Sequence, residues 1–141
     1  MSKHYLLDTC IWRDFYEARS GPGGRPLGSY AAHLISKIIS QKAKIIFSIV
    51  LVKELKRGHS MEGISEMLGL LSACDVLIRV DITEDEYDEA KRISTERDLP
   101  LSDCINAVQA RNHSALLVSQ DKHILEDLSD ISEVVRPEDV S

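Results

Sequence analysis

Short apolar runs alternate with amphipathic helical patterns along almost the whole chain, and this alternation limits the fold more than any other feature. The apolar runs have strand length, and the segments between them repeat apolar residues every three to four positions. Such alternation is typical of βαβ units and a mainly parallel sheet. We therefore expect one α/β domain over residues 1–141, a three-layer α/β/α sandwich around four to five mainly parallel strands.

Local signals give the approximate bounds of these elements. Strands are expected over 4–7, 43–47, 76–80, 115–118 and 131–135. Helices are expected over 9–19, 29–41, 48–57, 60–71, 83–98 and 103–112, with a short one after Gln120. Thr83 and Glu86 have capping-box spacing, and Ser48 and Ser102 are expected N-caps. The segment from Gly21 to Gly28 is rich in glycine and proline, and we expect an ordinary surface loop there.

Composition excludes several classes of protein. No apolar run approaches the roughly 20 residues of a membrane helix, and a carboxylate at position 8 interrupts any signal-peptide core. We expect a soluble, cytoplasmic protein without membrane contact. Cys10, Cys74 and Cys104 have neither disulfide-framework nor zinc spacing and are expected to be small buried hydrophobes. The net charge of −6 disfavours tight nucleic-acid binding unless a divalent metal supplies positive charge.

Two acidic residues lie just after expected strands, at positions where α/β proteins commonly have functional sites. Asp8 comes directly after the first strand, and Asp121 comes just after the fourth. Functional sites of open α/β sheets form outside the carboxyl ends of the strands. Asp103 opens a later helix, and Glu54 lies in a strongly apolar helix where a carboxylate needs a partner. Four converging acids would repel one another, and a hard cation such as Mg²⁺ or Mn²⁺ would relieve that repulsion.

Each acid also has an ordinary structural explanation. Asp8, Asp103 and Asp121 are acids at helix N-termini, where the helix dipole favours negative charge. Glu54 has basic neighbours in Lys53 and Arg57. Only the joint placement of the four acids favours a metal site.

Four sequence blocks together resemble the PIN-domain nucleases, in particular the VapC-type toxins of toxin–antitoxin systems. The blocks are Tyr-Leu-Leu-Asp-Thr at 5–9, Ser-Ile-Val-Leu-Val-Lys-Glu-Leu at 48–55, Leu-Pro-Leu-Ser-Asp-Cys-Ile-Asn-Ala at 99–107 and Leu-Leu-Val-Ser-Gln-Asp at 116–121. By this resemblance, a catalytic quartet of acids binds Mg²⁺ or Mn²⁺, and a serine two residues before the last acid hydrogen-bonds within the site. These residues are Asp8, Glu54, Asp103, Asp121 and Ser119.

The same resemblance implies an endoribonuclease with RNA as substrate, a homodimer, and an antitoxin protein as partner. It implies hydrolysis that leaves a 5′-phosphate and a 3′-hydroxyl. Thr9 is a weaker candidate for the same site as Ser119. The candidates for substrate contact are Thr9, Arg13, Lys53 and Arg57, with Lys56 and His59 nearby. Trp12 offers a stacking surface, although we expect it in the core.

Three other functions stay open at this point. An RNA-processing PIN nuclease without an antitoxin would have the same residues. A receiver-like phospho-acceptor domain has a similar length, but it needs an adjacent acidic pair after the first strand, and it leaves Glu54 unexplained. A third alternative is an inactive nuclease fold that binds RNA or protein, although all four acids are present.

Overall fold

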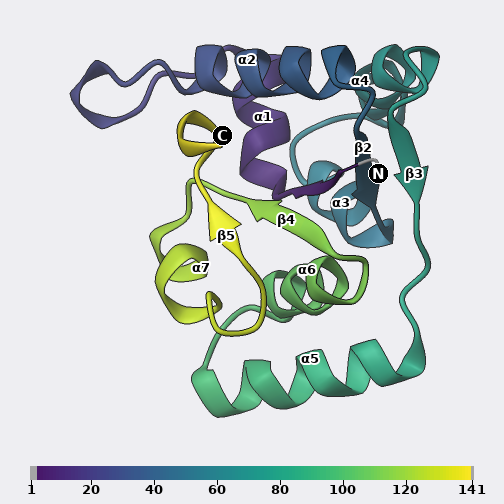
Figure 1. Cartoon of the computed structure of the whole chain (residues 1–141), viewed down its shortest axis with the longest axis vertical. Helices are drawn as coiled ribbons and strands as arrows, with labels where there is room; N and C mark the ends of the chain where they lie inside the picture. The colour runs from purple at the N-terminus through teal and green to yellow at the C-terminus, as the bar shows by residue number, and fades with distance from the viewer. Residues whose placement is uncertain (1–2, 141) are drawn as a thin grey trace.

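A five-stranded parallel sheet forms the centre of the protein in a computed structural model that describes residues 3–140. The strands are β1 (His4–Leu7), β2 (Lys44–Phe47), β3 (Leu77–Arg79), β4 (Ala115–Val118) and β5 (Val134–Val135). The helices are α1 (Thr9–Glu17), α2 (Leu27–Ser40), α3 (Ile49–Leu55), α4 (Met61–Ala73), α5 (Glu84–Arg97), α6 (Leu101–Asn112) and α7 (Lys122–Asp127), with 3₁₀ helices η1 (Pro22–Gly24) and η2 (Pro137–Asp139) (Figure 1).

The strand order is β3-β2-β1-β4-β5, and every neighbouring pair is parallel. This confirms the expected fold class. The fifth strand is present but spans only Val134–Val135 instead of the expected 131–135. The strand order makes the receiver-like alternative wrong, because receiver domains have the order 2-1-3-4-5. In the observed order the chain reverses its direction of winding at β1, so that β1 and β4 are neighbours at the switch point where α/β proteins place their sites.

Helices cover both faces of the sheet and give the protein its three layers (Figure 1). Successive side chains of β1 point to opposite faces of the sheet, and each face has its own apolar cluster. Tyr5 and Leu7 belong to one cluster, and Leu6 belongs to the other. The first cluster packs α1, α2 and α4 against the sheet, and the second packs α5, α6 and α7. Trp12 lies in the first cluster with 1% exposure, which confirms its expected core position.

Most of the expected caps are present. Ser48 accepts a hydrogen bond from the Val50 amide at 3.2 Å and begins α3. Thr83 and Glu86 form the expected reciprocal capping box of α5. Ser102 is not an N-cap, because α6 already begins at Leu101 after Pro100, whose fixed φ suits a helix entry.

Three other expectations differ from the structure. The helix expected from residue 29 begins at Leu27, so Gly28 belongs to α2 and the loop is shorter. Gly28 lies so close to α1 that a Cβ there would meet the Ala18 Cα at 2.7 Å. The helix expected to reach Arg57 ends at Leu55. Cys74 is exposed and Cys10 half-buried, so only Cys104 matches the expected buried cysteine. Among the described residues, no helix combines the length and apolar character needed to cross a membrane.

Candidate active site

Asp8 and Ser119 meet at the carboxyl edge of the sheet because their strands are paired. β1 and β4 run in parallel with Leu7 beside Val118, so the next residue of each strand emerges at the same point. The Ser119 hydroxyl donates to Asp8 Oδ2 at 2.9 Å, and the Asp8 amide donates to the Val118 carbonyl at 2.9 Å. Asp8 is 6% exposed and Ser119 is fully buried. The two side chains therefore form a fixed, buried polar pair.

Glu54 reaches the same region from α3. Thr9, the first residue of α1, donates its hydroxyl to Glu54 Oε1 at 2.8 Å. Arg13, one turn further along α1, donates to the backbone carbonyl of Glu54 at 2.8 Å. Glu54 thus has a hydroxyl partner, and Arg13 holds α1 against the end of α3. This bond engages one side of the Arg13 guanidinium, which was a candidate for substrate contact.

Asp103 and Asp121 are positioned by α6 and α7. Asp103 lies in the first turn of α6 and is partly exposed. Asp121 is the N-cap of α7 and accepts a hydrogen bond from the His123 amide at 2.8 Å. The Asp121 amide donates to the Ser119 hydroxyl at 3.0 Å, which ties this acid to the Asp8 pair. Asp8 is likewise the N-cap of α1, so both acids have a capping role as well.

The electrostatics show that the four acids converge around Asp103. Burial, and after it the charges of Asp8, Asp121 and Glu54 in that order, together raise the pKa of Asp103 to about 7. Burial also raises the pKa of Asp8, and the charge of Glu54 adds to that shift. Hydrogen bonds from Cys10 and Ser119 act in the opposite direction, because they stabilise the ionised carboxylate. The neighbouring charges therefore disfavour ionisation of both Asp8 and Asp103.

The donor set fits a hard divalent cation. All four acids provide carboxylate oxygens, which Mg²⁺ and Mn²⁺ prefer, and their mutual repulsion is relieved by positive charge. Within residues 3–140, no three His, Cys, Asp or Glu side chains already have the arrangement that holds a metal ion. A complete protein cage is not required for Mg²⁺, because this ion usually keeps several waters and uses one or two carboxylates together with substrate phosphates.

A groove of about 690 Å³ lies beside Glu54. Its floor is apolar, with Val50 from α3 and Ile105 from α6 among its lining residues. Lys53 and Arg57, two predicted substrate contacts, also line it, and both are exposed. Cationic side chains are thus available on the α3 side of the acids. Lys56 is exposed without lining the groove, and the His59 ring packs edge-to-face on Tyr16 at 5.9 Å.

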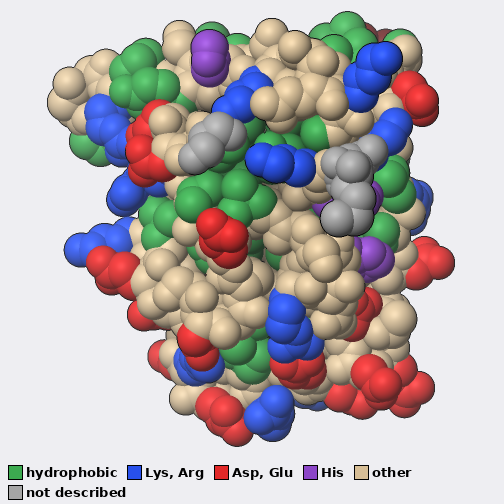
Figure 2. Space-filling view, in the orientation of Figure 1, with side chains coloured by type: hydrophobic (Ala, Val, Ile, Leu, Met, Phe, Trp, Pro, Cys, Tyr) green, Lys and Arg blue, Asp and Glu red, His purple; other side chains and the backbone are tan. Residues whose placement is uncertain are grey.

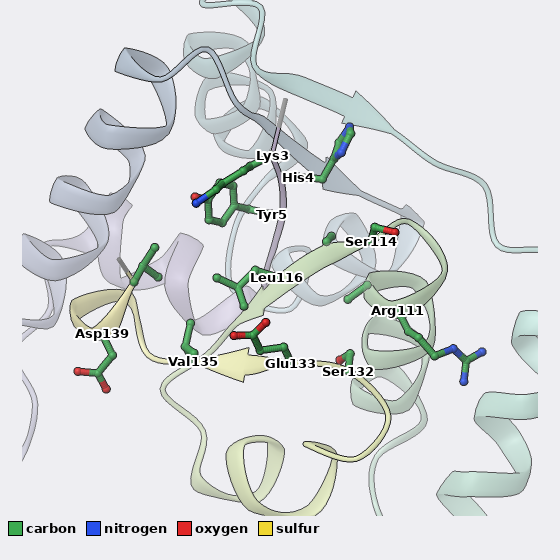
Figure 3. Close-up of a pocket in the computed structure, with 13 residues that line it drawn as sticks. Lys3, His4, Tyr5, Arg111, Ser114, Leu116, Ser132, Glu133, Val135 and Asp139 are labelled. Carbon is green, nitrogen blue, oxygen red and sulfur yellow. The ribbon is translucent and has the colours of Figure 1, made fainter. Parts of the chain in front are cut away.

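A second pocket, of about 570 Å³, is at the opposite edge of the sheet and is separate from the acids. Figure 3 shows its lining around the amino ends of β1 and β4, with Tyr5 and Leu116 facing the hollow and Glu133 reaching toward it. Hydrophobic side chains are visible on this face between charged ones (Figure 2). Among the described residues of the lining, Glu133 and Asp139 are the acids, and none of the four acids at the carboxyl edge belongs to it.

Sequence reasoning missed three residues that contact the site. Cys10, interpreted as a buried hydrophobe, donates its thiol to Asp8 Oδ2 at 3.3 Å. Its position two residues after Asp8, in the first turn of α1, is a signal that was available. Arg25 and Gln120 form a hydrogen bond at 3.2 Å beside Asp121. No sequence signal indicates this contact, because it joins residues that are 95 positions apart.

Comparisons with known proteins agree with this fold. No curated protein sequence matches the chain. The fold is similar to a toxin–antitoxin complex from Klebsiella pneumoniae, with a TM-score of 0.65, 19% identity, and coverage of 96% of this chain and 99% of that one. It is also similar to VapBC2 from Rickettsia felis bound to a promoter DNA fragment (TM-score 0.64, 16% identity, 94% and 98% coverage). A third similar structure is FitAcB from Neisseria gonorrhoeae (TM-score 0.58, 16% identity, 96% and 99% coverage). The family profile described as PIN domain matches residues 5–130, and the chain therefore belongs to the PIN domain family.

Proposed function

We propose that this protein is a metal-dependent endoribonuclease and the toxin component of a toxin–antitoxin pair. The observation that carries the proposal is the convergence of Asp8, Glu54 and Asp121 on Asp103, whose pKa burial and these charges raise to about 7. Such a cluster is unfavourable for folding and is therefore expected to serve a function. Membership of the PIN domain family supports nuclease chemistry, and the similarity to toxin–antitoxin complexes supports the toxin role.

Mg²⁺ or Mn²⁺ is the proposed cofactor, held by Asp8, Glu54, Asp103 and Asp121. When bound, the ion supplies charge neutralisation at the scissile phosphate and lowers the pKa of an attacking water. The residues of the chain orient this donor set. Ser119 and Cys10 donate to the same oxygen of Asp8 and leave Oδ1 to the Thr9 amide. These hydrogen bonds hold the carboxylate in one rotamer and favour its ionised form.

A hydrogen bond from a neighbouring hydroxyl also holds the Glu54 carboxylate. The Thr9 hydroxyl donates to Oε1 and leaves Oε2 for other partners. Lys53 and Arg57 line the neighbouring groove, where they would contact the phosphates of the RNA strand. This assigns Thr9 and Ser119 to orienting carboxylates and Lys53 and Arg57 to the substrate. Arg13 then acts through its bond to the Glu54 backbone.

The proposed partners are an antitoxin protein and a second copy of this chain, in the cytoplasm. An RNA-processing PIN nuclease would use the same acids without an antitoxin. Expression alone and with a protein encoded beside the gene distinguishes the two. A toxin arrests growth unless the neighbouring protein is present, and copurification of that protein identifies it as the antitoxin. Light scattering after gel filtration measures whether the free chain is a dimer.

The decisive experiment is cleavage of structured and single-stranded RNA by the purified chain with Mg²⁺, with Mn²⁺ or with EDTA. We expect cleavage with either metal and none with EDTA. The Asp8→Asn variant should lose cleavage, because it removes a central charge of the cluster while preserving its shape. A matched control is Asp88→Asn, which removes an exposed carboxylate on α5 that is remote in sequence and outside the cluster.

Three results would overturn the proposal. Cleavage that persists in EDTA, or that survives Asp8→Asn, would assign the activity to another site or to a contaminant. A chain that binds RNA but leaves it intact with every metal would instead be the inactive binding module. Single-stranded DNA in a parallel reaction shows whether the activity is specific to RNA.

A further inference from the structure

The loop after α1 is fixed directly beside the acidic site. Arg25, at the end of this loop, donates from Nη2 to Gln120 Oε1 at 3.2 Å. Gln120 lies between Ser119, which donates to Asp8, and Asp121. The backbone of the loop is closed by a hydrogen bond from the Gly21 amide to the Arg25 carbonyl at 2.7 Å. The guanidinium is therefore hydrogen-bonded to the residue that lies between Ser119 and Asp121 in the chain.

A carboxylate from the C-terminal segment is bound to this guanidinium. Glu138, in η2, forms an ion pair with Arg25 through Oε2. Its other oxygen, Oε1, accepts a hydrogen bond from the Gln120 side-chain amide at 2.8 Å. Glu138 thus binds two donors, a guanidinium and an amide, with its two oxygens. A phosphate presents a similar pair of oxygens, which a guanidinium and a neighbouring amide can bind in the same way.

The site needs cations on this side. Four acids repel a polyanion, and on the α3 side Lys53 and Arg57 oppose that repulsion. On the α7 side, Lys122 lies 3.9 Å from Glu126 and His123 lies 3.7 Å from Asp127, so both are close to carboxylates of their own helix. The Arg25 side chain is 41% exposed and is bound to Gln120, so it is a cation available to the strand on this side.

We propose that Arg25 and Gln120 bind a phosphate of the RNA strand next to the cleavage site, and that Glu138 occupies this position as a competing carboxylate in the free protein. The inference rests on the proposed ribonuclease function. The RNA backbone displaces Glu138, so the C-terminal segment lowers the affinity for substrate. Glu138, one of the acidic residues that are unusual for a protein that binds RNA, then acts as an internal competitor.

The test measures RNA binding in the Asp8→Asn background, with a labelled single-stranded oligonucleotide and a series of salt concentrations. Glu138→Gln should lower the Kd about three- to fivefold, because Arg25 is released for the strand. The slope of log affinity against log salt should steepen by about 0.7, the value for one additional phosphate contact on a single strand. Arg25→Gln should raise the Kd, and the Arg25→Gln/Glu138→Gln double variant should behave like Arg25→Gln alone.

Asp130→Asn is the matched control. Asp130 forms a two-bond ion pair with Arg97, at 2.8 Å for each bond, so this variant makes the same change in net charge and also releases an arginine. Arg97 ends α5, and its hydrogen-bond partners are Asp127 and Asp130. Asp130→Asn should therefore change the Kd less than Glu138→Gln does. Equal effects of the two variants would show that the change in net charge alone explains the change in Kd, and this would overturn the inference.

A second variant protects the test against a folding defect. Gln120→Met removes the amide donor and leaves the ion pair intact, and it should weaken RNA binding. Melting curves identify any variant that does not fold. If the wild-type chain cleaves RNA in an Asp8-dependent way and neither Glu138→Gln nor Gln120→Met differs from the control, the inference fails while the proposed function stands. If the wild-type chain neither binds nor cleaves RNA, the proposed function itself fails.

Discussion

The Ser119 hydroxyl lies 2.9 Å from Asp8 Oδ2, although 111 positions separate the two residues. The parallel register of β1 and β4 produces this contact, because Leu7 and Val118 are directly paired. The same hydroxyl accepts a hydrogen bond from the Asp121 amide at 3.0 Å. One buried hydroxyl thus connects an acid after β1 with an acid after β4 and fixes the geometry of both.

We expect Ser119→Ala to lower the cleavage rate and the affinity for Mn²⁺ about tenfold, because hydrogen bonds that support metal ligands typically contribute this much. Mn²⁺ titration followed by electron paramagnetic resonance measures the affinity independently of cleavage. Ser129→Ala is the control, because Ser129 is exposed and its hydroxyl makes only a long bond of 3.4 Å to the Glu126 carbonyl. Unchanged Mn²⁺ affinity in Ser119→Ala would show that the bond does not orient Asp8.

Thiol labelling should distinguish the three cysteines. Cys74 is exposed and should react first with iodoacetamide, whereas Cys104 is buried and should react last. Cys10 is half-buried, but burial and the charge of Asp8 raise the pKa of its thiol, so little thiolate forms. Peptide mapping by mass spectrometry measures the order. Asp8→Asn should speed the labelling of Cys10, since it removes one cause of the raised pKa; labelling of wild-type Cys10 as fast as Cys74 would contradict this account.

Two glycines in helices should respond in opposite ways to alanine. A Cβ at Gly28 would meet backbone atoms of α1, with the Ala18 Cα at 2.7 Å and the Asp14 carbonyl oxygen at 2.9 Å. Gly28→Ala should therefore destabilise the fold by about 1–3 kcal/mol. A Cβ at Gly69, in α4, would meet nothing within 4 Å, and Gly69→Ala should stabilise by about 0.5–1 kcal/mol. Urea unfolding measures both changes, and equal shifts would contradict the close approach of α1 and α2.

The fold class and the positions of the acids could be predicted because they depend on local patterns. Short apolar runs determine the strands, and the rule that sites form at the carboxyl ends of parallel strands places Asp8 and Asp121 together. The convergence of Glu54 and Asp103 on that edge agrees with the resemblance to PIN-domain nucleases. Their pKa coupling, in which nearby charges raise the pKa of Asp103 beyond the effect of burial, depends on tertiary structure.

Contacts between distant segments could not be predicted. Arg25 meets Gln120 and Glu138 across 95 and 113 positions, and neither pattern nor spacing indicates such a contact. The start of α2 was misplaced for a related reason, since Gly28 is typical of a loop in sequence but lies in a helix packed closely on α1. The hydrogen bond of Cys10 was missed because its apolar neighbours favoured a core interpretation.

The repulsion around Asp103 gives the metal-free protein a specific dependence on pH. Burial and the neighbouring acids raise the pKa of Asp103 from 3.8 to about 7 in the folded state. Between about pH 4 and pH 7 the unfolded chain releases this proton before the folded protein does, so the contribution of Asp103 to stability falls as the pH rises. Above pH 7 the ionised Asp103 carboxylate destabilises the folded protein fully, and below pH 4 this destabilisation disappears.

Asp103→Asn should therefore raise the melting temperature of the metal-free protein at pH 8, and the difference from wild type should vanish toward pH 4. Because Asp103 is partly exposed, we expect a gain of about 1–2 kcal/mol, or a few degrees. With Mg²⁺ at pH 8, wild type should melt at a higher temperature than the variant. The cation binds the wild-type acids, and the variant has one carboxylate fewer for it to bind. Calorimetry at pH 4, 6 and 8, in EDTA and in Mg²⁺, measures both effects. A variant less stable than wild type at pH 8 in EDTA would mean that Asp103 is favourably paired in the folded state, and the acids would then not form a repelling cluster.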